Sequence, residues 1–189
     1  MLTIIVPSQF KILPWKNGKG ETTELAINHQ GTLDDFDWRL SIASVVEDGM
    51  FSDFSSYERN LVLIKGQGIT LQHDEQTTDH LSALLSFATF DGGCKTQGTL
   101  LNGVIKDFNI ITRQKLYRTQ VNTYQTKQEV LIAPCKFCFV YSLTSNVLIS
   151  STTKTQNLEQ GHLLQGSDLD DDLSVVGESM IIVQLRLRA

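Results

Sequence analysis

The sequence predicts an all-β protein made of many short antiparallel strands. Val, Ile and Thr together number 44 of the 189 residues, whereas Ala numbers only 6. β-Branched side chains pack well on a pleated sheet, and helix-rich chains normally contain much more Ala. Apolar runs with period two also recur at nearly regular spacing, which is typical of a sandwich or barrel and not of a parallel α/β sheet.

The individual strands follow from these runs. The start of the chain, residues 1–6, lacks the basic region of a signal peptide and is expected to be a strand. Residues 60–64 form a short apolar run that stops at Gly66-Gln67-Gly68, and residues 69–72 then alternate, which predicts strand, glycine turn and strand. The other expected strands are 23–27, 38–45, 84–90, 116–122, 129–133, 137–143, 146–151 and 180–186; segment 104–112 is apolar, and strand or helix is left open for it.

A weak internal repeat predicts two small barrels in one chain. Residues 61–64, a glycine turn, 69–71, a polar stretch and 84–90 are followed later by 138–141, a turn, 147–149, a polar stretch and 161–164. The order and lengths of these pieces agree, although their residues mostly differ. We expect approximate halves 1–100 and 101–189. No linker rich in Gly, Ser or Pro separates them, so residues 1–189 are expected to act as a single intertwined unit.

Composition excludes several functional classes. The formal net charge is −5, so no basic stripe is available for nucleic acid or an anionic membrane surface. No apolar run approaches the roughly 20 residues of a membrane-spanning helix. The 3 cysteines do not suit a secreted disulfide framework, which makes the cytoplasm the expected location.

The common catalytic and metal motifs are missing. Cys135 and Cys138 form a C-x-x-C without a second pair, and two buried structural thiols are expected. His73 and His80 lack the spacing of paired metal ligands and are expected to be surface histidines. There is no phosphate loop, complete dinucleotide fingerprint or nucleophile elbow. We therefore expect neither a metal nor a cofactor.

Three clusters hold more polar residues than the strands and turns of the fold require. They are residues 15–24, 38–59 and 106–113. Each holds or adjoins an arginine next to an apolar run, namely Arg39, Arg59 and Arg113. A buried arginine is costly unless it is paired. Its partner is either an internal carboxylate or the carboxylate of a ligand held by the planar guanidinium. The candidate internal carboxylates are Glu24, Glu58 and Asp107.

These clusters resemble the HutD/Ves family of the RmlC-like cupin superfamily. The residues that carry the resemblance are Trp15-x-Asn17-Gly18-x-Gly20-x-Thr22-x-Glu24, Trp38-Arg39-x-Ser41-Ile42-Ala43, Gly49-x-Phe51-Ser52-x-Phe54 with Glu58-Arg59, and Asp107-Phe108-Asn109-x-x-x-Arg113. The resemblance implies a bicupin, an accessory or regulatory role in histidine utilisation, and a ligand such as formiminoglutamate. It implies no metal, because the chain has no H-x-H pair. Ser55-Ser56 stand where members often have Pro-Gly, and Gln114 where a second Arg is common.

Two functions follow from this resemblance. The first is a ligand-binding protein without catalysis, whose partner is a small acidic metabolite. Arg59 occupies the family's Glu-Arg position and would bind the carboxylate, with Trp15, Asn17, Thr22, Trp38 and Arg39 around it. The alternative is a metal-independent isomerase, hydrolase or lyase acting on such a carboxylate, with Glu24, Glu58, Asp107 or Tyr57 as the titratable group. A homodimer and a plain interaction module are left open.

Overall fold

The computed structural model describes residues 1–15 and 20–188. Within these residues the chain forms antiparallel strands and one short 3-10 helix, η1 (Pro7–Gln9). The all-β prediction is therefore confirmed. No helix in the described ranges has the length and apolar character needed to cross a bilayer.

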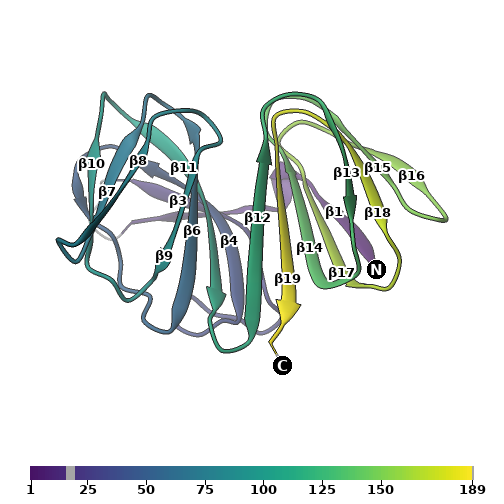
Figure 1. Ribbon diagram of the computed structural model, residues 1–189, viewed down its shortest axis with the longest axis horizontal. Coiled ribbons are helices and arrows are strands. Elements are labelled where there is room, and N and C mark those ends of the chain that lie inside the picture. Colours follow the sequence, from purple (N-terminus) through teal and green to yellow (C-terminus); the bar gives the residue numbers. More distant parts are fainter. Residues whose placement is uncertain (16–19, 189) are drawn as a thin grey trace. The chain divides into compact units, whose positions relative to one another are not determined.

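The chain divides into two compact units, each with its own sheets (Figure 1). The central unit is Phe10–Leu116, and the terminal unit combines Met1–Gln9 with Tyr117–Ala189. In Figure 1 the first strand, β1 (Leu2–Ile5), lies beside β17 (Leu163–Leu169), which confirms that the start of the chain is a strand. This division differs from the expected halves 1–100 and 101–189. The segment after residue 100 supplies a strand of the central unit's larger sheet, and the first residues pair with the last third of the chain.

The central unit is a sandwich of two antiparallel sheets. The larger sheet has the order β2-β3-β4-β11-β6-β9 and the smaller one β5-β10-β7-β8. The strands of the larger sheet are β2 (Lys11–Pro14), β3 (Glu21–Ile27), β4 (Trp38–Val45), β11 (Ile105–Arg113), β6 (Tyr57–Lys65) and β9 (Phe87–Asp91). Those of the smaller sheet are β5 (Gly49–Met50), β10 (Thr96–Leu100), β7 (Ile69–His73) and β8 (Thr77–Leu81).

The terminal unit repeats this architecture. Its sheets have the orders β1-β17-β14-β19-β12 and β13-β18-β15-β16. The further strands are β12 (Tyr117–Tyr124), β13 (Gln128–Ile132), β14 (Cys135–Ser142), β15 (Val147–Ser150), β16 (Thr155–Leu158), β18 (Leu173–Gly177) and β19 (Met180–Leu187).

The two units are topological copies. In the central unit β4, β11, β6 and β9 are successive neighbours, and in the terminal unit β12, β19, β14 and β17 take the same places. The smaller sheets correspond in the same way, with each strand displaced by eight positions in the strand order. The internal repeat is therefore real. In the described residues the two sheets of a unit are not joined by a strand ladder, so each copy is a jelly-roll sandwich and not a closed barrel.

Local sequence explains the strands that were hard to predict. Segment 104–112 belongs to β11, which lies between β4 and β6 in the larger sheet. Both its faces are buried, so its apolar residues do not alternate with polar ones. The turn between β6 and β7 needs glycine, because Gly66 and Gly68 have φ angles of 98° and 134°. A Cβ atom at Gly68 would lie 2.4 Å from the carbonyl oxygen of Leu81.

Each unit has its own hydrophobic core. In the central unit the core joins Leu61 and Leu63 of the larger sheet to Ile69 and Leu71 of the smaller one. In the terminal unit it contains Cys135 and Cys138, which are free thiols and buried, as predicted. Burial raises the pKa of both thiols, so neither is activated as a nucleophile.

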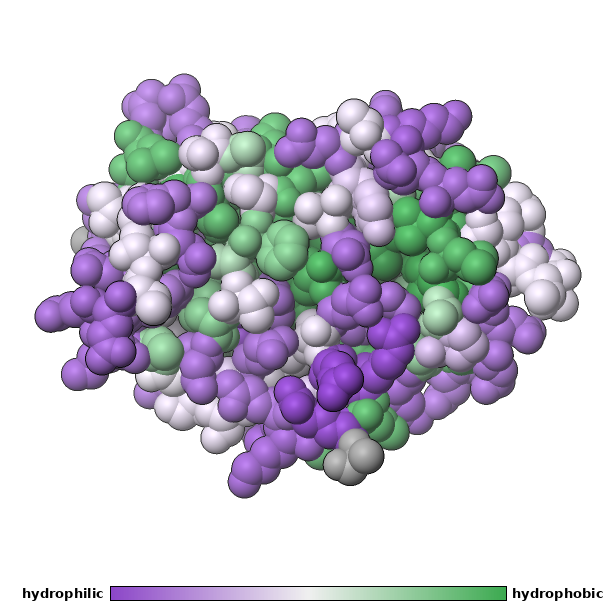
Figure 2. Space-filling view, in the orientation of Figure 1, coloured by the Kyte–Doolittle hydropathy of each residue, from purple (hydrophilic) through white to green (hydrophobic). Residues whose placement is uncertain are grey.

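The outward rows of the strands are mixed in character. On the face drawn in Figure 2, hydrophobic residues gather in patches among hydrophilic ones. Leu131 and Leu148, on the smaller sheet of the terminal unit, are exposed, whereas their neighbours Ile132 and Ile149 are buried. This alternation is expected of strands that turn one row of side chains inward and the other outward.

Candidate functional site

The inner face of the larger central sheet carries an unusual set of polar residues. Ser41 on β4 pairs with Asn109 on β11, and Ile111 pairs with Arg39 on one side and Arg59 on the other. Beside them a cavity of about 550 Å³ opens. Its polar lining includes Thr22, Arg39, Ser41, Arg59 and Asn109, and its apolar lining includes Leu13, Trp15, Leu33, Phe51, Phe54 and Ile111.

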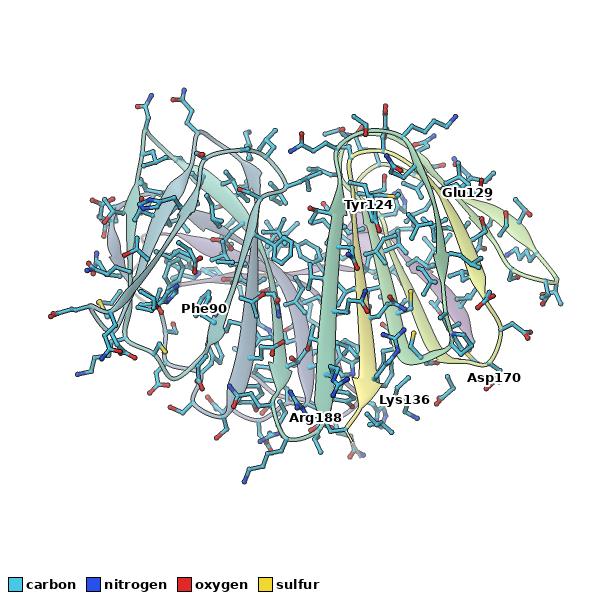
Figure 3. All side chains as sticks on the ribbon, viewed as in Figure 1. Phe90, Tyr124, Glu129, Lys136, Asp170 and Arg188 are labelled. Atoms are coloured by element: carbon cyan, nitrogen blue, oxygen red, sulfur yellow. The ribbon has the colours of Figure 1, made fainter. Side chains whose placement is uncertain are left out.

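Arg59 is the more deeply buried of the two cations in the described lining of this cavity. Its side chain projects from β6 on the same face as Leu61 and Leu63, as the period-two pattern predicts. Only 4% of the residue is exposed. Its Cζ atom lies 5.1 Å, 5.3 Å and 5.3 Å from the ring centres of Phe51, Phe54 and Phe90. Phe90, on β9, is labelled in Figure 3. Aromatic faces stabilise a desolvated guanidinium electrostatically but cannot accept its hydrogen bonds in line.

A short polar chain connects Arg59 to a buried carboxylate. Arg59 Nη2 donates to Asn109 Oδ1 at 2.9 Å, and Asn109 Nδ2 donates to Asp107 Oδ1. Arg59 Nη1 also donates to the carbonyl oxygen of Ser52 at 3.4 Å. Among the described residues, Arg59 Nε and Asp107 Oδ2 have no hydrogen-bond partner. The pair is therefore only partly satisfied inside the protein.

Burial shifts the pKa of both ends of this chain. Desolvation lowers the pKa of Arg59 to about 10, and Asp107 partly opposes that shift. Desolvation likewise raises the pKa of Asp107 to about 7, against the stabilising effects of Arg59, Asn109 and the backbone of Ala43. At neutral pH the guanidinium stays charged, whereas burial favours the protonated form of the Asp107 carboxyl group.

Arg39 has a different, direct counter-ion. Its Nε lies 2.8 Å from Glu24 Oε2, and both side chains are buried. Lys11 Nζ approaches the other oxygen of Glu24 at 3.8 Å from the surface. The internal ion pair that the sequence offered as one explanation for Arg39 is present, and Arg39 nevertheless lines the cavity.

Trp15 and Thr22 form one side of the cavity. Trp15 Nε1 donates to Thr22 Oγ1 at 2.8 Å. A Cβ atom at Gly20 would lie 2.9 Å from the indole ring, so glycine permits the close approach of this ring to the backbone. The structure thus brings Trp15, Thr22, Arg39 and Arg59 together around one cavity. Asn17, also expected in the site, lies outside the described residues.

Trp38 and Arg113 lie elsewhere. Trp38 is 2% exposed and sits on the face of β4 opposite to Arg39, away from the lining of the cavity. Arg113 Nη2 donates to Asp35 Oδ1 at 2.5 Å, to the Phe36 carbonyl at 3.0 Å and to the Tyr57 hydroxyl at 2.9 Å. Arg113 therefore holds the segment before β4 in place. Gln114 donates to Asp91 Oδ2 at 3.0 Å.

Sequence reasoning did not assign Asn109, Ser41, Phe51 or Phe54 to the site. A usable signal existed for Asn109, because Asp107 and Asn109 alternate with Phe108 and Ile110 in an otherwise apolar strand. Two polar residues in one row of a buried strand indicate a polar patch on one face. The phenylalanines carry no such signal, since an aromatic residue in a loop before a strand is common.

The titratable groups named for the enzyme alternative do not line the cavity. Its described lining contains no carboxylate, histidine, cysteine or tyrosine. Glu24 is paired with Arg39, and Tyr57 donates its hydroxyl to the Phe36 carbonyl at 2.7 Å. Glu58 accepts a hydrogen bond from Asn60. The arrangement can neutralise and orient an anion, but it offers no evident general base in the described residues.

The histidines also differ in part from expectation. His80 is exposed, as predicted, whereas the surface position expected for His73 is wrong. His73 Nδ1 lies 2.9 Å from Thr96 Oγ1, and its Nε2 lies 3.1 Å from Asp79 Oδ2. Its ring packs on Phe90 at 4.4 Å between centres. Within the described ranges no group of three or more His, Cys, Asp or Glu residues is placed to hold a metal ion.

The terminal unit keeps only part of this polar row, because the buried Gln184 takes the place of Asn109. Leu61 and Leu63 pair with Asn109 and Asp107 in the central unit. In the repeat, Cys138 and Val140 of β14 take the places of the two leucines and pair with Gln184 and Ile182. The position of Asp107 is therefore filled by Ile182, a core residue that is 2% exposed. The buried carboxylate of the central copy therefore has no counterpart at this position of the terminal copy.

Fold and site together define a cupin-type protein with a ligand-sized cavity and a cationic interior. The chain belongs to the HutD family, whose model matches residues 8–183. The family prediction is thus confirmed over nearly the whole chain.

Individual relatives agree with this assignment. The chain is 33% identical over 149 residues to an uncharacterised 21.2 kDa protein in the hutC 3′ region of Pseudomonas putida, covering 79% of this chain and 77% of that one. The structure of HutD from Pseudomonas fluorescens SBW25, described as its formate condition, superposes with a TM-score of 0.86 at 29% identity, covering 100% of both chains. A cupin 2 conserved barrel domain protein from Leptotrichia buccalis matches with a TM-score of 0.55 at 10% identity, covering 96% of this chain and 100% of that one. The last likeness concerns the fold alone.

Proposed function

We propose that the cavity of the central unit binds a small carboxylate metabolite, and that the protein is an accessory or regulatory component of histidine utilisation. The observation that carries this proposal is the state of Arg59. A buried guanidinium faces a cavity whose described lining holds no carboxylate, and its hydrogen bonds reach the Asp107 carboxylate only through Asn109. A ligand carboxylate would pair directly with Arg59, which no carboxylate of the described residues does.

The shape and lining of the cavity suit a small amphipathic anion. Its volume of about 550 Å³ lies within the range of about 300–1,000 Å³ for small-molecule sites. Thr22, Ser41 and Asn109 offer neutral hydrogen-bonding groups beside the two arginines. Trp15, Phe51 and Phe54 offer apolar walls for the carbon skeleton. Such a site recognises a carboxylate at one end and a short carbon chain behind it.

The family supports the metabolic context. One relative is described by its position in the hutC 3′ region, and the Pseudomonas fluorescens HutD structure is described by a formate condition. Formate, formylglutamate and formiminoglutamate are therefore the ligands to test first. The cytoplasmic location stays a prediction, and a homodimer stays open.

Thermal unfolding with and without ligand tests the proposal. A ligand present at a hundredfold excess over its dissociation constant stabilises the native state by about 2.7 kcal/mol, which corresponds to roughly 5–10 °C in a chain of this size. Arg59→Ala is expected to abolish this shift, and Arg59→Lys to weaken it, because an ammonium group cannot reproduce the planar guanidinium.

A matched variant separates binding from folding. Arg113→Lys alters an arginine that ties a loop outside the cavity lining, so it is expected to keep the ligand-induced shift even if its baseline melting temperature falls. Ligand-induced stabilisation that survives intact in Arg59→Ala would show that Arg59 is not the anchor.

Mass spectrometry of the incubated ligands tests the enzyme alternative, which predicts turnover.

A further inference from the structure

Asp107 is a buried carboxyl group whose described hydrogen bonds do not require it to be ionised. It lies on the inner face of β11 and is 0% exposed. Its Oδ1 accepts the hydrogen bond from Asn109 Nδ2, while its Oδ2 has no partner in the described part of the chain. A carboxylate buried in this way would be neutralised by protonation if no cation were near.

A single cation, Arg59, favours the ionised form of Asp107. On the strands packed around it, the inward charged groups are Arg59 on β6, Arg39 on β4 and Glu24 on β3. The opposing sheet presents His73 on β7, with Asp79 on β8 as its partner. Arg39 and Glu24 neutralise each other at 2.8 Å. Arg59 is the cation whose electrostatic attraction lowers the pKa of Asp107, against the larger effect of burial.

Arg59, which has no direct counter-ion among the described residues, is therefore the cation for which two anions compete. A ligand carboxylate that binds Arg59 from the cavity places a second negative charge close to the Asp107–Asn109 chain. Like charges in a poorly solvated site disfavour each other's ionised form, so only one of the two carboxyl groups remains charged. The ligand reaches solvent through the cavity, whereas Asp107 is fully enclosed. Asp107, the enclosed group, is therefore the carboxyl group that becomes protonated and neutral.

We infer that Asp107 is the internal counter-ion of Arg59 and takes up one proton from solvent when a carboxylate ligand occupies the cavity. The new O–H bond forms on Oδ2, because Oδ1 is engaged with Asn109. The proton comes from hydronium or a buffer acid, whose bond to that proton breaks, and no bond of the protein or the ligand breaks. The inference rests on the proposed carboxylate-binding function and adds a positioning residue that sets how affinity depends on pH. Ligand binding is then tightest at neutral and mildly acidic pH, and weakens when Asp107 is held ionised by alkaline pH.

Calorimetric titration with formate between pH 6 and pH 9 tests this linkage in the full-length protein. The dissociation constant is expected to rise by up to about tenfold for each pH unit above 7, the limit for one linked proton. Titrations at pH 8 in buffers of different ionisation enthalpy are expected to report uptake approaching one proton per formate. A difference infrared spectrum should show the carbonyl band of a protonated carboxyl group appearing on binding.

Two variants make the result specific to Asp107. Asp107→Asn keeps the acceptor for Asn109 and removes the competing charge, so its formate affinity should be independent of pH and, at pH 9, tighter than that of the parent. Glu58→Gln removes a carboxylate from the opposite row of β6, keeps the acceptor for Asn60, and should retain the parent's pH dependence and proton uptake. Should Asp107→Asn fail to fold, the buffer and infrared measurements on the parent decide alone.

The outcomes separate this inference from the proposed function. Formate binding with no proton uptake at pH 8, or an unchanged pH dependence in Asp107→Asn, would overturn the role of Asp107 and leave carboxylate binding standing. An absence of formate, formylglutamate and formiminoglutamate binding at pH 6 would overturn both.

Discussion

Arg39 and Arg59 share one partner: each lies directly opposite Ile111, on the two sides of β11. Neighbouring strands lie about 4.8 Å apart, so the two arginine backbones are roughly 10 Å apart in one row across the sheet. Both guanidinium groups line the same cavity. Arg39 is neutralised directly by Glu24, and Arg59 only through Asn109.

This spacing predicts a preference for dicarboxylates over formate. One ligand carboxylate can bind Arg59 while the other approaches Arg39. Replacing Arg39 and Glu24 together by Gln removes this ion pair without leaving an unpaired buried charge. We expect the double variant to lose about tenfold in affinity for formylglutamate, or about 1.4 kcal/mol, measured by calorimetry.

Formate provides the internal control for that variant. A single carboxylate needs only Arg59, so its affinity should change by less than about twofold. An equal loss for both ligands would mean that Arg39 shapes the cavity and does not bind the second carboxylate.

The pKa of Asp107 predicts an unusual pH dependence of stability. Its folded pKa, raised to about 7, exceeds the unfolded value of about 3.9. The folded state therefore binds this proton more tightly, and the stability it contributes is present at low pH and lost as pH rises towards 7. Asp107→Asn removes the loss, so its free energy of unfolding relative to the parent should increase by about 1–2 kcal/mol between pH 5.5 and pH 8 in urea titrations. A constant difference across that range would contradict the shift.

The Tyr57 hydroxyl is predicted to stabilise the central unit. It donates to the Phe36 carbonyl at 2.7 Å and accepts from Arg113 at 2.9 Å. Tyr57→Phe leaves the buried Phe36 carbonyl and the half-buried Arg113 side chain each short of one hydrogen bond, and we expect a loss of about 1–2 kcal/mol in denaturant titrations. Tyr124→Phe is the control, because the described residues offer its hydroxyl no hydrogen-bond partner; its cost should stay near 0.5 kcal/mol or less. Equal effects of the two changes would argue against the contribution of the Phe36–Arg113 link.

Metal content gives a further prediction. The described residues contain no cluster fit to hold an ion, and the chain has no H-x-H pair. Purified, untagged protein is expected to carry far less than one transition-metal ion per chain by inductively coupled plasma mass spectrometry. Its melting temperature should not respond to chelators. A stoichiometric metal that survives dialysis would contradict this and revive the enzyme alternative.

The sequence predicted those parts of the fold that local periodicity controls. The run around Arg59, Leu61 and Leu63 has one inward row, and the structure places all three on that face. Segment 104–112 could not be assigned, because a strand buried on both faces has no alternation to read. The boundary between the units was misplaced for a related reason, since strand pairing between distant segments leaves no local trace.

Single residues of the candidate site could be proposed from the sequence, but their network could not. Arginines beside apolar runs led to Arg39 and Arg59, because an arginine in a strand is conspicuous, and the structure places both on the lining of one cavity. The same criterion selected Arg113, which serves the loop before β4, and large aromatic character selected Trp38, which lies on the other face. Only three-dimensional structure reveals that Asn109 joins Arg59 to Asp107, because that link depends on register between β6 and β11.

The substitution of Ile182 for Asp107 between the two copies has an evolutionary consequence. After duplication, one copy holds a buried carboxylate that makes folding costly, whereas the other has the aliphatic Ile182 at that position and the neutral Gln184 at the position of Asn109. Under the proposed function, selection for the ligand acts on the central half, while the position of Ile182 is constrained by volume and packing. In homologues, the positions of Cys138, Val140 and Ile182 should therefore accept different hydrophobic residues. The positions of Arg59, Asp107 and Asn109 should hardly vary.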